Sequence, residues 1–369
     1  MTCENKKEKF YKHINGLKGV ACLLIMVGHY LGIYKYAQLF KPAISIIDRL
    51  DNSRFSFFIS ESYWLYLFFV ISGYLIAKSK IDNINNLFSK SVNRFLRFAL
   101  PVFFSYSIIY LIYVIIGFHN VETKKLFQCL WYQKFYLDVY SINEVIYSPF
   151  YVLFLGKCKL NSPYWVLQMM FFSSLLIYII KYLYVKFEND NRAPYFFSIL
   201  VIVTILSSLF SKIIMACFVG MLISFYENKD IQTKGYYAFW VIFLSMCIYI
   251  MSNVMKSTLF FAALIYYIPK INWINRIFSS KVFQVLGNIS WGIYSFHWPF
   301  ICSFGALSII KFSKNIGLIK SYFITFFIVL ILTIIISIFF YYTFERLSLY
   351  LIMLLNNRVF KLMKLSIKN

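Results

Sequence analysis

Apolar runs of roughly 20 residues recur along nearly the whole sequence, and this pattern restricts the fold more than any other feature. One run of that length is enough for an α-helix to cross the hydrocarbon core of a bilayer. The composition agrees, because 61% of the residues are hydrophobic and 22% are aromatic. The mean hydropathy of +0.69 lies outside the range of soluble globular proteins. The sequence therefore predicts an all-α, polytopic membrane protein.

We expect about ten membrane-spanning helices. The predicted spans cover residues 16–36, 60–79, 95–117, 163–185, 194–210, 213–227, 236–254, 257–270, 283–310 and 318–344. The short apolar stretch 145–156 contains Pro149 and Gly156, and we interpret it as a re-entrant or interfacial piece. No separate soluble domain is expected, so residues 1–369 are predicted to form a single integral membrane domain.

The charge is strongly positive, with 37 Lys and Arg residues against 14 Asp and Glu residues, a net charge of +23. These basic residues are spread through the segments between spans and form no recognisable nucleic-acid-binding module, so nucleic acid is not an expected partner. With the N-terminus inside, the inner segments carry more Lys and Arg than the outer ones. We therefore predict that both termini are cytoplasmic and that the protein resides in the cell membrane.

The seven cysteines form no C-x-x-C pair and no spacing typical of metal ligands, so no metal is expected. Cys129 and Cys158 share one predicted outer segment, where a disulfide is one option.

Two of the four histidines, His29 and His297, lie inside predicted spans. An ionisable side chain at membrane depth is costly, so it indicates a functional site. At about 1.5 Å per residue, both lie about 20 Å from the inner face, so they could line one polar cavity. The alternatives are a packing role for either histidine, or for His297 a hydrogen bond that caps the break before Pro299.

A basic cluster is predicted at the inner face. Lys18 lies near the start of the first span, Arg94 and Arg97 open the third, and Glu345 with Arg346 closes the tenth. Lys and Arg are the side chains that hold phosphates, although interfacial anchoring also places them at helix ends.

Two further features are candidates for ligand contact. Ser72 and Gly73 are small residues in the second span, which allow either close helix packing or room for a ligand. The outer segment 118–162 is rich in aromatic residues, including Trp131, which could stack on sugar rings or lie at the membrane interface.

Taken in order, six elements resemble those of the acyltransferase-3 family of integral membrane acyltransferases. They are residues 15–19 with His29 separated from Lys18 by ten residues, residues 69–76, Arg94 with Arg97, residues 163–167, residues 286–299 and residues 341–346. The resemblance covers about residues 14–346. Asn15 and Lys18 replace the commoner Asp and Arg, and residues 168–172 carry no carboxylate where many members have a Glu.

The resemblance implies transfer of an acyl group, usually acetyl, from cytoplasmic acyl-CoA to a hydroxyl of an extracytoplasmic glycan or lipid-linked sugar. It implies that His29 is the catalytic base or nucleophile. Lys18, Arg94 and Arg97 would bind the phosphates of coenzyme A. Weaker supporting or substrate-binding candidates are His297, Ser72, Gly73, Trp165 and Glu345.

Two other functions stay open. A polytopic transporter or flippase of a glycan-related substrate would also use intramembrane histidines, but the sequence shows no convincing internal repeat. An inactive relative that serves as an assembly partner would fit the missing fourth-span Glu.

Overall fold

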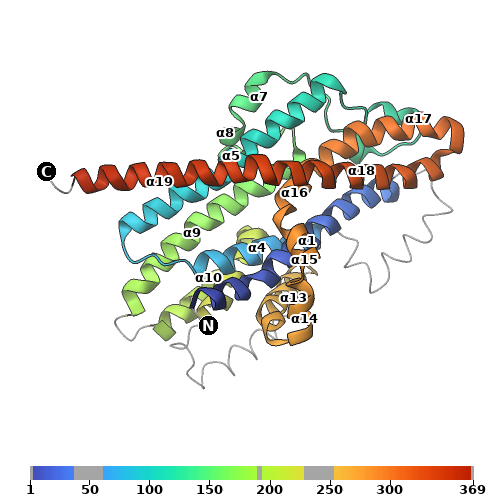
Figure 1. The fold of residues 1–369 in the computed structure, drawn as a ribbon. Helices are drawn as coiled ribbons and strands as arrows, with labels where there is room; N and C mark the ends of the chain where they lie inside the picture. Colours follow the sequence, from blue (N-terminus) through green and yellow to red (C-terminus); the bar gives the residue numbers. More distant parts are fainter. Residues whose placement is uncertain (1–2, 37–60, 189–192, 228–252, 367–369) are drawn as a thin grey trace. The chain divides into compact units, whose positions relative to one another are not determined.

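The computed structural model describes residues 3–36, 61–188, 193–227 and 253–366 (Figure 1). Within these ranges the chain folds into helices and has no strand, so the predicted all-α class is confirmed. Five stretches are long and apolar enough to cross a membrane: Lys12–Ile33, Ile84–Ile115, Ser162–Lys186, Ser290–Ile316 and Leu318–Asn356. Three shorter apolar helices cover Tyr63–Ala77, Phe196–Phe210 and Lys212–Tyr226.

Some predicted boundaries differ from those in the structure. The third predicted span, 95–117, lies within a longer helix, α5 (Ile84–Ile115), except for its last two residues. The helix begins earlier than predicted, and Asn83 Oδ1 caps its start by accepting the Asn86 backbone N–H at 2.8 Å. The predicted start of the ninth span at residue 283 is wrong. Residues 281–288 form a separate helix, α15 (Lys281–Asn288), and the crossing stretch begins with α16 (Ser290–Phe300).

Three other predicted segments are the short stretch 145–156 and the spans 236–254 and 257–270. The stretch 145–156 lies in two short helices, α7 (Ile142–Ile146) and α8 (Ser148–Leu153), of five and six residues, which are too short to cross a bilayer. The predicted span 236–254 lies almost entirely outside the described residues. The next predicted span, 257–270, corresponds to α13 (Asn253–Tyr267) and the following turn.

Contacts divide the chain into two compact units whose segments alternate along the sequence. The first unit takes residues 1–25, 60–91 and 169–287, and the second takes residues 26–59, 92–168 and 288–369. Three long helices contribute to both units: α1 (Cys3–Tyr36), α5 and α9 (Trp165–Glu188).

In the first unit, two helices pack with their backbones in contact. These are α4 (Glu61–Ala77) and α11 (Lys212–Tyr226), which follows α10 (Ala193–Phe210). A β-carbon at Gly73 would overlap the carbonyl of Cys217, and one at Gly220 would overlap that of Val70. The two glycines therefore allow the close approach, as small residues do between membrane helices.

The start of α1 packs against α15 in the same unit. The Asn15 side-chain amide donates to the backbone carbonyl and to the side-chain oxygen of Gln284, at 3.4 Å in each case. A β-carbon at Gly19 or at Gly287 would overlap the backbone of the facing helix. Residues 15–19 (Asn-Gly-Leu-Lys-Gly) on α1 therefore pack closely against α15, and Asn15 donates hydrogen bonds between the two helices.

In the second unit, residues 290–366 form nearly continuous helix with two π-helical turns. The elements after α16 are η6 (Ile301–Gly305, π-helical), α17 (Ala306–Ile316), α18 (Leu318–Phe340), η7 (Tyr341–Glu345, π-helical) and α19 (Arg346–Ser366). Gly317, with φ of 80°, makes the turn between α17 and α18. Figure 1 shows α18 and α19 as one long rod.

The segment between α5 and α9 is tied to the π-helical turn η6. The backbone N–H of His119 donates to the Cys302 carbonyl at 2.9 Å, and the Tyr132 hydroxyl donates to the Ile301 carbonyl at 2.9 Å. A π-helical turn disrupts the regular ladder of helix hydrogen bonds. The loop therefore contributes donors to carbonyls in the irregular part of the helix.

Candidate functional site

His29 on α1 and His297 on α16 are hydrogen-bonded to each other in the second unit. The distance between His29 Nδ1 and His297 Nε2 is 2.8 Å. The two rings are nearly parallel, with 8° between their planes and 5.1 Å between their centroids. The sequence predicted similar depths for the two side chains, and the structure brings them into direct contact.

The next residue on α1 fixes this part of the helix against α18. Tyr30 donates its hydroxyl to the backbone carbonyl of Tyr322 at 2.7 Å, and the Tyr322 hydroxyl donates to the carbonyl of Tyr30. Both tyrosines are about 1% exposed. The backbone that carries His29 is therefore held by two buried hydrogen bonds.

His297 is fully buried and makes a second contact through its other ring nitrogen. Its Nδ1 lies 3.0 Å from the carbonyl oxygen of Ile293, one helical turn earlier. This bond does not cap the break before Pro299 that we considered as an alternative, because the carbonyl that loses its helical partner at Pro299 is that of Ser295.

Three aromatic side chains, which we name the aromatic wall, pack against one another: Trp131, Phe135 and Trp298. The two tryptophans lie beside His29. The His29 ring centroid is 5.5 Å from that of Trp298 and 6.2 Å from that of Trp131. Trp298 is buried, whereas Trp131, on the short helix α6 (Leu130–Gln133), is partly exposed. Sequence reasoning did not place Trp298 at the site, although it follows His297 directly.

The predicted phosphate-binding residues belong to different units. Arg94 and Arg97 lie on α5 in the second unit, and Lys18 lies on α1 in the first. The Arg94 guanidinium is 4.5 Å from the ring centroid of Phe98, and Arg97 is exposed. Phosphate binding by these residues stays a prediction.

Among the weaker candidates, Ser72 and Gly73 lie in the first unit, where Ser72 is buried and Gly73 allows the contact between α4 and α11. Glu345 ends the π-helical turn η7 in the second unit and is partly exposed. A role for any of them in substrate binding stays a prediction.

Trp165 is 45% exposed at the start of α9, whereas its neighbour Tyr164 is fully buried. The Tyr164 hydroxyl is 2.7 Å from Ser105 Oγ and donates to Ser295 Oγ at 2.6 Å. Sequence reasoning missed Tyr164. Its buried hydroxyl links the 3-10 turn η3 (Ser162–Tyr164), just before α9, to α5 and to the helix that carries His297.

Gln168 occupies the region where a Glu is common in the family that the sequence resembles. Its side-chain amide donates to the carbonyl of Phe154 at 2.8 Å, a bond that an ionised carboxylate cannot make.

Cys129 and Cys158 are free thiols, so the disulfide considered for them is not formed. Burial raises the pKa of the Cys158 thiol to about 12. Within the described residues, no group of His, Cys, Asp and Glu side chains is arranged to hold a metal ion.

Comparison with known proteins gives one match. A family model described as an acyltransferase domain spans residues 11–342 and so includes both histidines of the pair, the aromatic wall and the predicted phosphate-binding residues Lys18, Arg94 and Arg97. No curated protein and no solved structure matches the chain.

Proposed function

We propose that this chain, which belongs to the acyltransferase-3 family, moves an acetyl group from cytoplasmic acetyl-CoA to a hydroxyl of an extracytoplasmic glycan or lipid-linked sugar. The family model covers most of the chain, so the protein is a membrane acyltransferase. The donor, the acceptor and the cell membrane as its location are parts of the proposal.

The observation that carries the proposal is the hydrogen-bonded pair of His29 and His297 within the stretch that the family model matches. Acyl transfer to a hydroxyl needs a group that accepts a proton or carries the acyl group. A neutral imidazole does either at physiological pH.

Two routes are open to His29. As a base, His29 takes the proton of the acceptor hydroxyl while the acceptor oxygen attacks the thioester carbonyl. The proton then passes from His29 to the departing CoA thiolate. As a nucleophile, His29 first attacks the thioester carbonyl and releases the CoA thiolate. The acceptor oxygen then attacks the acyl carbon and displaces the imidazole, and the hydroxyl proton passes through the freed imidazole to the thiolate. Both routes yield one ester and one free thiol.

The donor would be bound through its phosphates. Arg94 and Arg97 lie at i and i+3 on α5, a spacing that puts two guanidiniums on one side of a helix. Arginine pairs with phosphate through bidentate hydrogen bonds. We propose that both contact the phosphates of coenzyme A, and that Lys18 also contributes to phosphate binding.

The acceptor would meet the aromatic wall. Trp131 is partly exposed beside His29 and comes from a segment between two membrane-crossing helices. A flat aromatic face can pack against the apolar face of a sugar ring while the hydroxyls stay free to react. This arrangement supports a glycan acceptor.

The test uses membranes from cells that produce wild-type protein or the His29→Ala variant, each supplied with radiolabelled acetyl-CoA. Label should appear in a base-labile ester of glycan or lipid with the wild type only. His119→Ala is the matched control, because it also removes a histidine but its ring contacts Ile116 and Glu122 instead.

Equal labelling by wild type and His29→Ala, at equal protein levels, would overturn the role of His29. If the wild type transfers label from a longer acyl-CoA instead, acetyl is the wrong group. Labelled protein that accumulates without acceptor, and is lost in His29→Ala, would favour the acyl-carrier route.

A further inference from the structure

We infer that His297 is a positioning residue that selects the tautomer of His29, so that His29 Nε2 is the nitrogen that takes part in acyl transfer. The inference rests on the proposed function for its catalytic consequence, but its structural part can be tested without any activity.

His297 is the fully buried member of the pair, and its contact with the helix backbone determines its tautomer. The Ile293 carbonyl oxygen can only accept a hydrogen bond, so the contact at 3.0 Å requires a proton on His297 Nδ1. A neutral imidazole carries one N–H, and His297 Nε2 is then an unprotonated acceptor.

The tautomer of His297 in turn determines that of His29. His297 Nε2 lies 2.8 Å from His29 Nδ1, and one of the two nitrogens must donate. Since His297 Nε2 is the acceptor, the proton is on His29 Nδ1. The helix carbonyl thereby fixes both tautomers in turn, and the lone pair of neutral His29 is at Nε2.

This order of protons has a chemical consequence. A base or nucleophile needs an available lone pair, and the nitrogen opposite the hydrogen-bonded one is the reactive atom in catalytic histidines. After His29 Nε2 gains a proton or an acyl group, its Nδ1–H still donates to His297, so the ring keeps its orientation through the reaction.

The small number of histidines permits a direct structural test. The chain has four, so protein labelled with ¹⁵N-histidine and reconstituted in bilayers gives four rings to observe. ¹⁵N NMR separates protonated from unprotonated ring nitrogens, and single substitutions of His13, His29, His119 and His297 assign the signals. We expect neutral His29 to carry its proton on Nδ1. A proton on Nε2 would overturn the inference whatever the enzyme does.

The activity test compares two substitutions of His297. His297→Gln can keep a side-chain oxygen as an acceptor for the His29 N–H, whereas His297→Phe keeps a flat ring without any acceptor. We expect His297→Phe to lower kcat by about 100-fold or more, the size of a lost general-base contribution, with little change in the KM for acyl-CoA. The kcat of His297→Gln should be at least about tenfold higher than that of His297→Phe.

The outcomes are distinct. If the kcat values of the two variants differ by less than about tenfold, or if His297→Phe has the kcat of the wild type, His297 does not act through the tautomer of His29. If one variant fails to fold, the wild-type NMR spectrum still decides. Ser303→Ala is the matched control on the same helical run, because the Ser303 hydroxyl donates to the local Pro299 carbonyl and not to the histidine pair. An inactive wild type with the expected tautomer would refute the proposed function alone.

Discussion

Asn161 donates its side-chain amide to the backbone carbonyl of Ser295 at 2.8 Å. Ser295 precedes Pro299 by four residues, so its carbonyl is the one that loses its helical partner because proline has no N–H. Asn161 is fully buried. A loop residue thus replaces the helix hydrogen bond missing two residues before His297.

Replacing Asn161 by Ala should destabilise the protein, because the buried Ser295 carbonyl then has no donor from this side chain. We expect a loss of about 1–3 kcal/mol in the free energy of unfolding. The melting temperature in detergent, followed by intrinsic fluorescence, measures it. Asn143→Ala, at an exposed position in the same segment, should change little. An unchanged melting temperature for Asn161→Ala would contradict the role of this bond.

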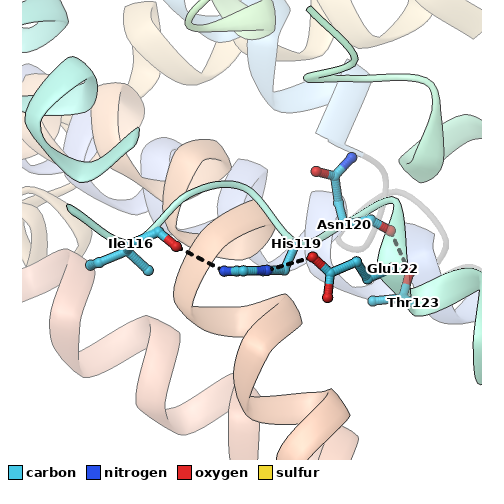
Figure 2. A network of polar contacts seen from close by, with 5 residues as sticks. All are labelled: Ile116, His119, Asn120, Glu122 and Thr123. Carbon is cyan, nitrogen blue, oxygen red and sulfur yellow. Dashed lines mark hydrogen bonds and ion pairs between the residues drawn. The ribbon is translucent and has the colours of Figure 1, made fainter. Parts of the chain in front are cut away.

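Figure 2 shows a polar network in the segment between α5 and α9, where His119 contacts Glu122 and the Thr123 hydroxyl donates to the Asn120 carbonyl. The Asn120 side chain is fully buried and donates to the carbonyls of Tyr132 at 3.0 Å and Phe135 at 2.8 Å. The His119–Glu122 pair, at 2.9 Å, has side chains 21% and 56% exposed.

Asn120→Ala should therefore cost about 2 kcal/mol of unfolding free energy, since two carbonyls lose a buried donor. Glu122→Gln should cost less than about 1 kcal/mol, as solvent-exposed ion pairs do. Melting temperatures of the two variants under one condition decide the order. A larger loss for Glu122→Gln would show that the exposed pair stabilises the loop more than the buried amide.

Gly73→Ala should impair folding, because its β-carbon would overlap the Cys217 carbonyl and separate α4 from α11. Overpacking of this kind costs about 1–3 kcal/mol or more. Gly32→Ala is the matched control, since its β-carbon would meet Trp131 at an ordinary 3.7 Å. The yield of monodisperse protein and its melting temperature measure both effects. Equal yields and melting temperatures would contradict the close contact.

Cys158 should react slowly with maleimide at neutral pH. Burial raises its pKa to about 12, and the thiolate is the reactive form. Because the pKa is raised, the thiolate fraction should keep rising above pH of about 9, where an ordinary thiol is already largely ionised. A cysteine introduced by Ser141→Cys, at an exposed position, should react faster and level off earlier. Mass spectrometry without reduction should find Cys129 and Cys158 unlinked.

The sequence predicted similar depths for His29 and His297 because helix rise converts position into depth. His29 and His297 lie at similar distances into spans that were expected to run in the same direction, and this was sufficient to suggest one site. The hydropathy pattern likewise gave the helical class and several of the crossing helices.

Other features depend on contacts between distant residues, which hydropathy does not encode. The apolar run through residues 283–310 gave no sign of the break between Asn288 and Ser290. The roles of Asn161 and Tyr164 depend on Ser295, more than 100 positions away along the chain.

The aromatic wall combines side chains of two origins, since Trp298 comes from a membrane-crossing helix and Trp131 from the segment between two such helices. Substitution or exchange of residues around Trp131 changes the surroundings of His29 while every crossing helix keeps its sequence. On the proposed function, relatives can therefore differ in the acceptor that they recognise through this segment, while the contact between the two imidazoles stays the same.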